Sequence, residues 1–279
     1  MIVAKILYGQ PVAEAITAEA LKRAQVLRAR GIVPALALVS TDQSGARHLD
    51  RITDTCAAAG VEVYCANLPG TSRLKTNIDN INRDTGIHGA VFMRPLPDAA
   101  SEDLLRNTLN RFKDVDGVTL SSLAAIFVGH GEAFVPCPAK AAMEVLDYYG
   151  VPLSGRRVTI IGRSLVIGKP LSMLLLERDA TVTFCNSKSR DIDAICRESD
   201  VLVCGSLTPG LLSRECFRPG QTVLDVGDRI IGDDEEDGVS VAEAALAAGA
   251  DASPAEGGVD AGSCAMLALH TVQAAELLN

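Results

Sequence analysis

Short apolar segments alternate with helix-like segments along the second half of the chain. The four strand candidates are rich in valine, isoleucine and leucine and fall at 156–162, 180–186, 199–205 and 221–227. The helix-like segments between them fall at 169–179, 190–199 and 211–220. Strands that alternate with helices pair in parallel through right-handed crossovers. This half therefore predicts a Rossmann-type, doubly wound parallel sheet.

The first half of the chain has the same rhythm. Helical spacing at 12–31, 49–60 and 76–84 alternates with strand candidates at 34–40, 61–68 and 87–97. A stretch rich in glycine and proline at 130–140 separates the halves, before a helix at 141–150. A further apolar helix is expected at 263–278. With 279 residues, the chain is long enough for two α/β domains.

The stretch VTIIGRSLVIGKPLSMLLL, at 158–176, joins an apolar strand ending at Gly162 to a helix with Pro170 in its first turn. Proline is tolerated in the first turn of a helix, because a backbone N–H group at that position would have no acceptor within the helix. A helix N-terminus presents unpaired backbone N–H groups, so we expect a phosphate at this turn. The spacing from Gly162 to Gly168 does not match the G-x-G-x-x-G fingerprint. A tight strand-to-helix connection without a ligand therefore stays open at this point.

The segment after the second of these strands is basic. It reads Asn186, Ser187, Lys188, Ser189 and Arg190, with no carboxylate directly at the strand end. An NAD site usually has Asp or Glu here for the ribose 2′-hydroxyl, whereas cations suit a 2′-phosphate. The composition predicts NADP, with an ordinary polar surface loop as the alternative.

Composition excludes several classes of protein. The net charge of −9 and the pI near 5.0 give no basic footprint, so we expect no nucleic-acid partner. No apolar run approaches the roughly 20 residues of a membrane span, and the N-terminal stretch has no cleavage-site pattern. We expect no membrane contact and a cytoplasmic location. The acidic run Asp233 to Asp237 is expected to be a solvated loop.

The eight cysteines are scattered without a C-x-x-C pair, and several lie in apolar runs such as VLVCGS. Closely spaced cysteine pairs are typical of zinc sites. Disulfide frameworks are typical of short secreted chains with a high density of cysteines. We therefore expect reduced core thiols, no disulfide framework and no metal site.

Several motifs together resemble the methylenetetrahydrofolate dehydrogenase/cyclohydrolase family. They occur in the family's order over nearly the whole chain, and the G-R-S-x-x-x-G-K-P segment is highly specific. The others are PLP at 95–97, KDVDG at 113–117, PC at 136–137, DVG at 225–227 and GGV at 257–259. The resemblance implies two α/β domains with a cleft between them. It implies a folate domain at 1–138, completed by the C-terminal helix 263–279, an NADP domain at 139–262, and a homodimer.

The resemblance also carries cofactor residues over to this chain. It implies that Arg163 and Ser164 follow the cofactor strand and that Ser187 and Lys188 meet the 2′-phosphate. The remaining implied cofactor-binding positions lie in the turn or near the nicotinamide, and they are Gly162, Gly168, Lys169, Gly257, Gly258 and Val259.

The folate side departs from the family pattern. The family's tyrosine and lysine, four residues apart on one helix, align with His48 and Ile52. Its glutamine in V-Q-L-P-L-P aligns with Met93, followed by Arg94, while the folate-contacting aspartate is kept as Asp116. The family's P-V-P-G-G-V-G-P appears as PAEGGVDA, which brings Glu256 and Asp260 next to the expected nicotinamide pocket.

These departures are expected to affect the two activities of the family differently. Removing hydride from 5,10-methylenetetrahydrofolate leaves a delocalised cation and needs no proton abstraction, so positioning does most of the work. Hydrolysis of that cation moves protons, and a positioned base is worth roughly 10²- to 10⁴-fold. Ile52 supplies no base. We therefore expect an NADP-dependent methylenetetrahydrofolate dehydrogenase of one-carbon metabolism with weak or absent cyclohydrolase activity.

Three other interpretations stay open. An unperturbed histidine side chain has a pKa near neutrality, so His48 could serve as a replacement base. The changes at His48, Ile52, Met93 and Arg94 could mark a dehydrogenase of the same fold with a different substrate. The altered PAEGGVDA segment could mark a non-catalytic paralogue that binds nucleotide or partners with an active relative.

Overall fold

The protein is described from a computed structural model of the whole chain. The described residues are 4–40, 46–67, 72–94, 96, 98–129, 133–205, 211–226, 230–231 and 239–279. The acidic run Asp233 to Asp237 lies outside them, as do Pro95, Pro97 and Gly227 of the quoted motifs. Internal contacts divide the chain into two units. Unit 1 comprises Met1–Val12 and Pro138–Ser263, and unit 2 comprises Ala13–Cys137 and Cys264–Asn279.

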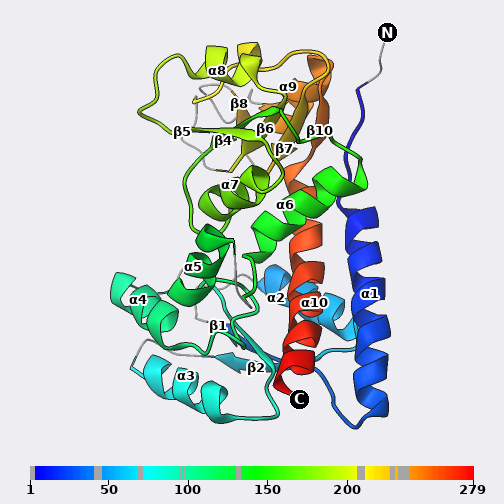
Figure 1. Cartoon of the computed structure of the whole chain (residues 1–279), viewed down its shortest axis with the longest axis vertical. Helices are drawn as coiled ribbons and strands as arrows, with labels where there is room; N and C mark the ends of the chain where they lie inside the picture. Colours follow the sequence, from blue (N-terminus) through cyan, green and yellow to red (C-terminus); the bar gives the residue numbers. More distant parts are fainter. Residues whose placement is uncertain are drawn as a thin grey trace. The chain divides into compact units, whose positions relative to one another are not determined.

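Unit 1 is built on a five-stranded sheet in the order β10-β7-β6-β4-β5, and every pair in it is parallel. The strands are β4 (Arg157–Ile161), β5 (Thr181–Cys185), β6 (Val201–Cys204), β7 (Thr222–Asp225) and β10 (Asp251–Ser253). The helices around them are α6 (Cys137–Tyr148), α7 (Gly168–Leu176), α8 (Ile192–Glu198) and α9 (Val241–Ala247). α8 and α9 lie on one side of the sheet and α6 and α7 on the other (Figure 1). The doubly wound α/β fold is confirmed.

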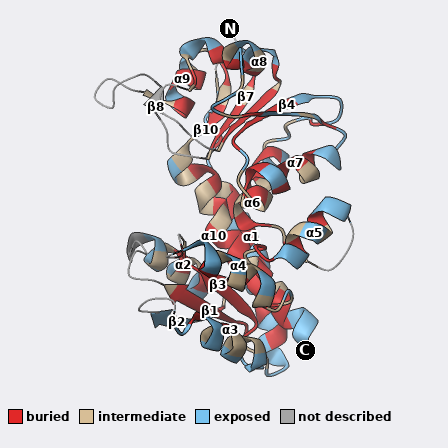
Figure 2. Cartoon of the chain, turned by 90° about the vertical axis from the view of Figure 1, so that its left-hand side faces the viewer, coloured by how far each residue is buried: buried red, intermediate tan, exposed pale blue. Residues whose placement is uncertain are grey.

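The central strands of this sheet are buried on both faces, as their apolar sequences require. Val158, Ile160 and Ile161 on β4 are at most 1% exposed, and β6 is buried throughout. Figure 2 shows these central strands as buried and the outer faces of the helices as exposed. The helix expected at 211–220 is wrong: only the short 3₁₀ helix η1 (Arg214–Cys216) forms there. Pro219 and Gly220 follow it, and neither residue favours helix.

The N-terminal segment adds to unit 1. Ile6 forms a parallel bridge with Ala252 of β10, and the Leu7 amide donates to the Ala252 carbonyl at 2.8 Å. Beyond β10, the turn η2 (Ala255–Val259) leads into the helix α10 (Asp260–Leu278). A short antiparallel pair, β8 (Ile230–Ile231) and β9 (Val239–Ser240), precedes α9. The sequence pattern predicted neither β10 nor α9, because both are short.

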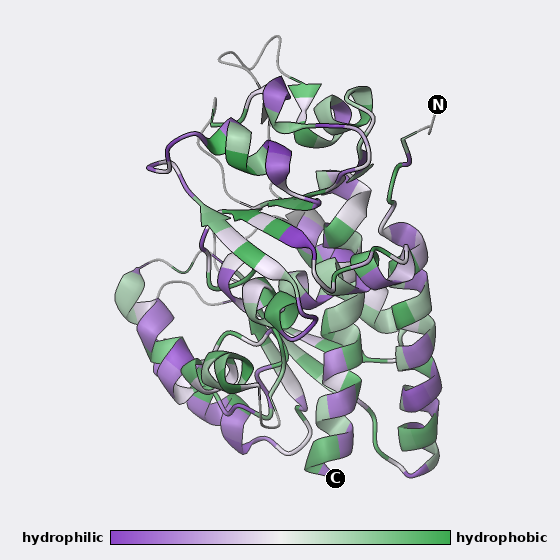
Figure 3. Ribbon diagram, turned by 45° about the horizontal axis from the view of Figure 1, so that its top comes forward, coloured by the Kyte–Doolittle hydropathy of each residue, from purple (hydrophilic) through white to green (hydrophobic). Residues whose placement is uncertain are grey.

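Unit 2 contains a parallel sheet in the order β2-β1-β3. Its strands are β1 (Ala35–Ser40), β2 (Glu62–Asn67) and β3 (Gly89–Phe92). Its helices are α1 (Gln10–Ala29), α2 (Ala46–Ala58), α3 (Leu74–Arg83), α4 (Ala99–Thr108) and α5 (Leu120–Val128), with most of α10. The helices carry alternating hydrophilic and hydrophobic bands (Figure 3). α4 and α5 were not expected from the sequence.

α10 packs closely against the three-stranded sheet. A Cβ atom at Gly89, the first residue of β3, would lie 2.8 Å from Val115 and 3.1 Å from the Thr271 hydroxyl. Arg23 of α1 forms an ion pair with Glu276, which joins the two long helices. The C-terminal helix is therefore part of the core of unit 2.

Seven of the eight cysteines are buried free thiols, as their apolar context predicts. Cys65 is the exception: it is exposed on β2, the edge strand of its sheet, in which every residue except Val63 is exposed. Among the described residues, no helix combines the length and apolar character that a bilayer crossing requires.

Candidate functional site

The turn between β4 and α7 is held close to the sheet by its two glycines. Gly162 has a φ of +111°, which favours glycine, and its amide donates to the Cys185 carbonyl at 2.9 Å. A Cβ atom at Gly168 would lie 2.7 Å from the Gly162 carbonyl oxygen. The first turn of α7 therefore packs directly on the end of β4, and a side chain at Gly168 would push them apart.

Ser164 accepts hydrogen bonds from backbone amides within this turn. Its hydroxyl accepts hydrogen bonds from the Ile167 amide at 3.2 Å and the Gly168 amide at 3.4 Å. Its carbonyl accepts from the Lys169 amide at 3.0 Å, and Pro170 has no N–H. The expectation of unpaired amides at this helix end is therefore wrong, because the serine side chain and backbone supply the acceptors that helix termini need.

The strand register brings the two cofactor segments to one edge of the sheet. Ile161 pairs with Cys185, so Arg163 and Ser187 each stand two residues beyond an aligned pair. Arg163, Ser187 and Lys188 are all exposed. Asn186 shapes the second segment: its side-chain oxygen accepts from the Lys188 amide at 3.0 Å. Two cations and a hydroxyl thus stand at the carboxyl ends of β4 and β5.

The Gly257–Val259 segment lies at the other end of the same edge, directly after β10. Gly257 has a φ of +73°, and its carbonyl accepts from the Gly9 amide at 2.8 Å. A Cβ atom at Gly9 would lie 1.7 Å from the Gly258 carbonyl oxygen, so the N-terminal segment and this turn touch through backbone alone. The Ser253 hydroxyl, at the end of β10, is buried without a hydrogen-bond partner among the described residues.

The carboxyl edge of the sheet therefore has glycine-containing turns after β4 and after β10, three strand spacings apart, and the basic segment after β5 lies one spacing further from β10. At about 4.8 Å per spacing, β5 and β10 are roughly 19 Å apart. The chain reverses direction across the sheet between β4 and β6, because β5 lies on one side of β4 and β6 on the other. Ligands of doubly wound sheets bind at such a switch point, outside the carboxyl ends of the strands.

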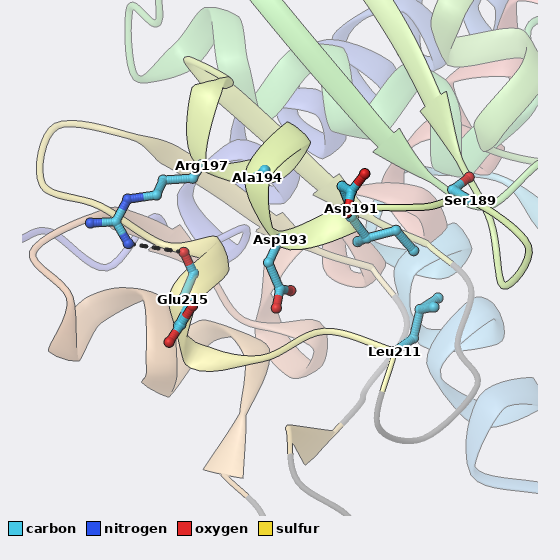
Figure 4. Close-up of a pocket in the computed structure, with 8 residues that line it drawn as sticks. Ser189, Asp191, Asp193, Ala194, Arg197, Leu211 and Glu215 are labelled. Carbon is cyan, nitrogen blue, oxygen red and sulfur yellow. Dashed lines mark hydrogen bonds between the residues drawn. The ribbon is translucent and has the colours of Figure 1, made fainter.

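A pocket adjoins the β5 turn at the start of α8 (Figure 4). Asp193 in its wall accepts from the Ser213 hydroxyl at 2.7 Å and the Cys216 thiol at 2.9 Å. The Arg197 guanidinium donates to the Glu215 carbonyl at 3.2 Å. These contacts fasten η1 to α8, so the wall of the pocket is a structural junction. Its lining residues are Ser189, Asp191, Ile192, Asp193, Ala194, Arg197, Leu211 and Glu215.

In unit 2, the three positions that the sequence resemblance is expected to align with the family's tyrosine, lysine and glutamine differ in exposure. His48 is exposed on α2, whereas Ile52, one turn later, is only 3% exposed. Met93 follows β3 and is 7% exposed, and its amide donates to the Val39 carbonyl at 2.8 Å. Ile52 and Met93 are therefore buried apolar side chains, and neither can exchange a proton.

Asp116 lies in a tight turn that Asp114 organises. The Asp114 carboxylate accepts from the Val118 amide at 2.9 Å, the Thr119 amide at 2.8 Å and the Ser122 hydroxyl at 2.6 Å. Burial raises the Asp114 pKa, and these hydrogen bonds oppose the rise. The three donors come from the turn and the start of α5, so they fix the backbone on both sides of Gly117.

Burial raises the pKa of Asp116 itself to about 7. The Arg94 guanidinium opposes that rise, the Asp114 carboxylate adds to it, and a hydrogen bond with Cys137 lowers it. A carboxyl group with a pKa near neutrality, beside a cation, is typical of functional sites. The structure thus brings Asp116 together with Arg94 and Cys137.

Two side chains support the same turn: Cys137 of the PC motif, and His270, which sequence reasoning did not single out. His270 Nδ1 on α10 donates to the Val115 carbonyl at 2.8 Å, and the Cys137 thiol donates to that carbonyl at 3.3 Å. The ring of Phe134 packs on the His270 ring with centroids 5.0 Å apart. Cys137 and His270 are 133 residues apart in sequence, so no local spacing could have indicated their contact.

Comparison with known proteins assigns both units to one family. Residues 7–116 match the model of the tetrahydrofolate dehydrogenase/cyclohydrolase catalytic domain, and residues 136–279 match that of its NAD(P)-binding domain. A bifunctional protein FolD of Carboxydothermus hydrogenoformans is 35% identical, over 99% of each chain.

Solved structures agree with this assignment. The bifunctional FolD enzyme of Campylobacter jejuni superposes with a TM-score of 0.89 at 27% identity, covering 98% of this chain and 99% of that one. The Trypanosoma brucei enzyme, solved in complex with NADP cofactor and inhibitor, gives a TM-score of 0.87 at 27% identity over 99% of both chains. The chain belongs to the tetrahydrofolate dehydrogenase/cyclohydrolase family.

Proposed function

We propose that this protein is an NADP-dependent 5,10-methylenetetrahydrofolate dehydrogenase with weak or absent methenyltetrahydrofolate cyclohydrolase activity. The observation that carries the proposal is the burial of two apolar side chains, Ile52 and Met93, at the positions of the family's lysine and glutamine. Asp116, the position that contacts folate in the family, keeps its carboxylate. Binding of the substrate is thus kept and the proton-transfer groups are missing.

The residues of unit 1 fit NADP. Arg163, Ser187 and Lys188 offer two cations and a hydroxyl to a 2′-phosphate, and no carboxylate stands among them to favour the free ribose hydroxyl. The buried Ser253 hydroxyl, unpartnered among the described residues, offers a hydrogen bond near the Gly257–Val259 turn. We assign the 2′-phosphate to the first group and the nicotinamide end to the second. Gly162, Gly168 and Lys169 line the turn between them.

NADP, when bound, supplies the hydride acceptor for this reaction. The chain's part is to hold the reacting groups in position, since hydride removal from the methylene carbon leaves no proton to abstract. Asp116, fixed by the Asp114 hydrogen bonds, accepts hydrogen bonds from the substrate in unit 2. The buried side chain of Ile52 excludes water where the family has its lysine.

The test measures both activities of the purified protein with the same folate preparation. We expect NADP-dependent oxidation of 5,10-methylenetetrahydrofolate, and decay of 5,10-methenyltetrahydrofolate no faster than in buffer alone. No NADP reduction would contradict the dehydrogenase proposal and favour the non-catalytic paralogue. Rapid enzyme-dependent decay would contradict the proposed loss of cyclohydrolase activity.

We also propose a homodimer formed through unit 1. β5 is the edge strand of its sheet, and Phe184 on it is 42% exposed. An uncovered edge with an exposed aromatic side chain favours association with another chain. Sedimentation equilibrium should give twice the chain mass for wild type, and Phe184→Asp should weaken the dimer.

A further inference from the structure

Arg94 is a cation in unit 2 whose hydrogen bonds are incomplete. It follows Met93 at the end of β3, and its side chain is 21% exposed. Its Nε and Nη2 atoms are buried and have no hydrogen-bond partner among the residues that the structure describes. Buried donors without an acceptor cost free energy, so each requires an explanation.

Arg106, by contrast, is an arginine whose guanidinium donates hydrogen bonds to neighbouring residues. Arg106 donates to the Val118 carbonyl and to Glu102 Oε2, each at 3.2 Å. Glu102 Oε1 lies 3.6 Å from Arg94 Nε, close enough for charge attraction but too far for a hydrogen bond. Glu102 therefore offsets the charge of Arg94 and leaves its donors unused.

Asp116 is a second acidic neighbour of Arg94. The two side chains interact electrostatically, because the Arg94 guanidinium lowers the Asp116 pKa. Together they present two N–H donors beside a carboxylate acceptor. A ligand with a carbonyl oxygen next to an N–H group, as in a lactam, satisfies both. A carboxylate ligand would bring an anion toward Asp116 and Glu102, which repel it.

We propose that Arg94 contacts the substrate directly, donating from Nε and Nη2 to the lactam carbonyl of a pterin ring whose adjacent N–H group donates to Asp116. Arg94 is then a specificity-determining residue that favours 4-oxo over 4-amino pterins. The inference rests on the proposed function, because it takes the substrate to be a folate.

Two ligands that differ in the lactam group of the pteridine ring test this contact. Folic acid carries the 4-oxo group, whereas aminopterin carries an amino group there, which donates instead of accepting. Titration calorimetry with each ligand gives the ratio of dissociation constants. For wild type we expect tighter binding of folic acid. Arg94→Leu should weaken folic acid binding by about 10- to 100-fold and change aminopterin binding by less than about threefold, since charged hydrogen bonds are the strong ones.

Controls separate a contact from a structural role. Arg28→Leu removes a surface arginine of the same unit, whose Nη2 donates to the Gly60 carbonyl, and should leave both affinities unchanged. Arg94→Lys keeps the positive charge but lacks the guanidinium's donor geometry, and it replaces Arg94→Leu if that variant does not fold. It should lower the preference for folic acid over aminopterin by less than Arg94→Leu does.

The outcomes distinguish the two proposals. Equal losses for both ligands in the Arg94 variants would show that Arg94 only supports the fold of the site, and would overturn this inference while leaving the dehydrogenase proposal intact. Wild type that binds folic acid no better than aminopterin would also overturn it. Wild type that binds neither ligand would contradict the folate assignment and this inference together.

Discussion

The cofactor side of unit 1 and the substrate side of unit 2 have diverged to different degrees. The turn after β4 keeps G-R-S-x-x-x-G-K-P, and backbone contacts explain why: Gly168 lies against the Gly162 carbonyl, and Ser164 caps the first turn of α7. In unit 2, Ile52 and Met93, which we propose stand at the positions of the family's lysine and glutamine, are buried apolar side chains. The proposed function therefore combines a maintained turn conformation in unit 1 with a loss of proton-transfer chemistry in unit 2.

The contrast has a physical basis. A turn closed by backbone approach tolerates few substitutions, because each one must move the main chain. A side chain that exchanges protons can be replaced by an apolar residue of similar size, and the fold loses nothing, since buried apolar groups stabilise it. Losing a catalytic base is therefore structurally easy, and losing the nucleotide turn is not.

The largest expected effect tests the loss in unit 2. Restoring the family's three side chains with His48→Tyr, Ile52→Lys and Met93→Gln should raise methenyltetrahydrofolate hydrolysis by roughly 10²- to 10⁴-fold, the usual worth of a positioned base. Ile52→Lys alone should give little, because residues that act as a unit are strongly non-additive. The decay of methenyl absorbance measures both.

A triple variant with Ile52→Met in place of Ile52→Lys is the matched control, since it repacks the site without an amine. Rapid hydrolysis by wild type, abolished by His48→Ala, would show instead that His48 has become the base. In that case the substrate side has changed its chemistry without losing it.

The next effect concerns Asp116 and pH. Its pKa is about 7 in the folded chain, against roughly 4 when unfolded, so the folded state binds the extra proton between these values. Stability therefore falls as pH rises from 4 to 7 and stays at the lower level above 7. Asp116→Asn removes this dependence and should be more stable than wild type at pH 8 by on the order of 2 to 4 kcal/mol.

Urea unfolding at pH 4.5 and pH 8 checks the sign, with the exposed Asp103→Asn as control. A stability difference between Asp116→Asn and wild type that does not grow with pH would mean that the carboxylate is already ionised at neutral pH. Asn should also weaken folate binding, because it replaces one acceptor oxygen with a donor.

On the cofactor side, Lys188→Asp should erase or reverse the preference for NADP over NAD by about 10- to 100-fold. The change puts a carboxylate beside Ser187, where it suits a ribose hydroxyl and repels a 2′-phosphate. Titration calorimetry at one salt concentration gives the ratio of dissociation constants, and Lys75→Asp on α3 serves as a surface control. Equal affinity of wild type for both nucleotides would contradict the NADP assignment.

How much of this could be predicted from sequence depended on the range of the interactions. The alternation of strands and helices predicted the parallel sheet, because it reflects local periodicity and burial. The short β10 and α9 have too few residues for such a pattern, and the 211–220 segment failed because its helix-like spacing ends in Pro219 and Gly220.

Site contacts were harder to predict than site positions. Cys137 and His270 meet at Val115 from distant parts of the sequence, and only the fold brings them together. The raised pKa of Asp116 follows from burial, which a motif does not report. Ser164 was expected to follow the cofactor strand, yet its capping of α7 depends on side-chain orientation within the turn.

The smallest expected effect tests that cap. Ser164→Ala leaves the Ile167 and Gly168 amides without their side-chain acceptor and should lower the free energy of unfolding by about 0.5 to 2 kcal/mol. Ser164→Thr keeps the hydroxyl and should stay near wild type. Urea unfolding measures the difference, and NADP titration of the same variants shows what the freed amides do. If Ser164→Ala is as stable as wild type, the turn is held by glycine packing alone. If it also binds NADP more tightly, the amides are phosphate ligands that Ser164 covers in the free protein.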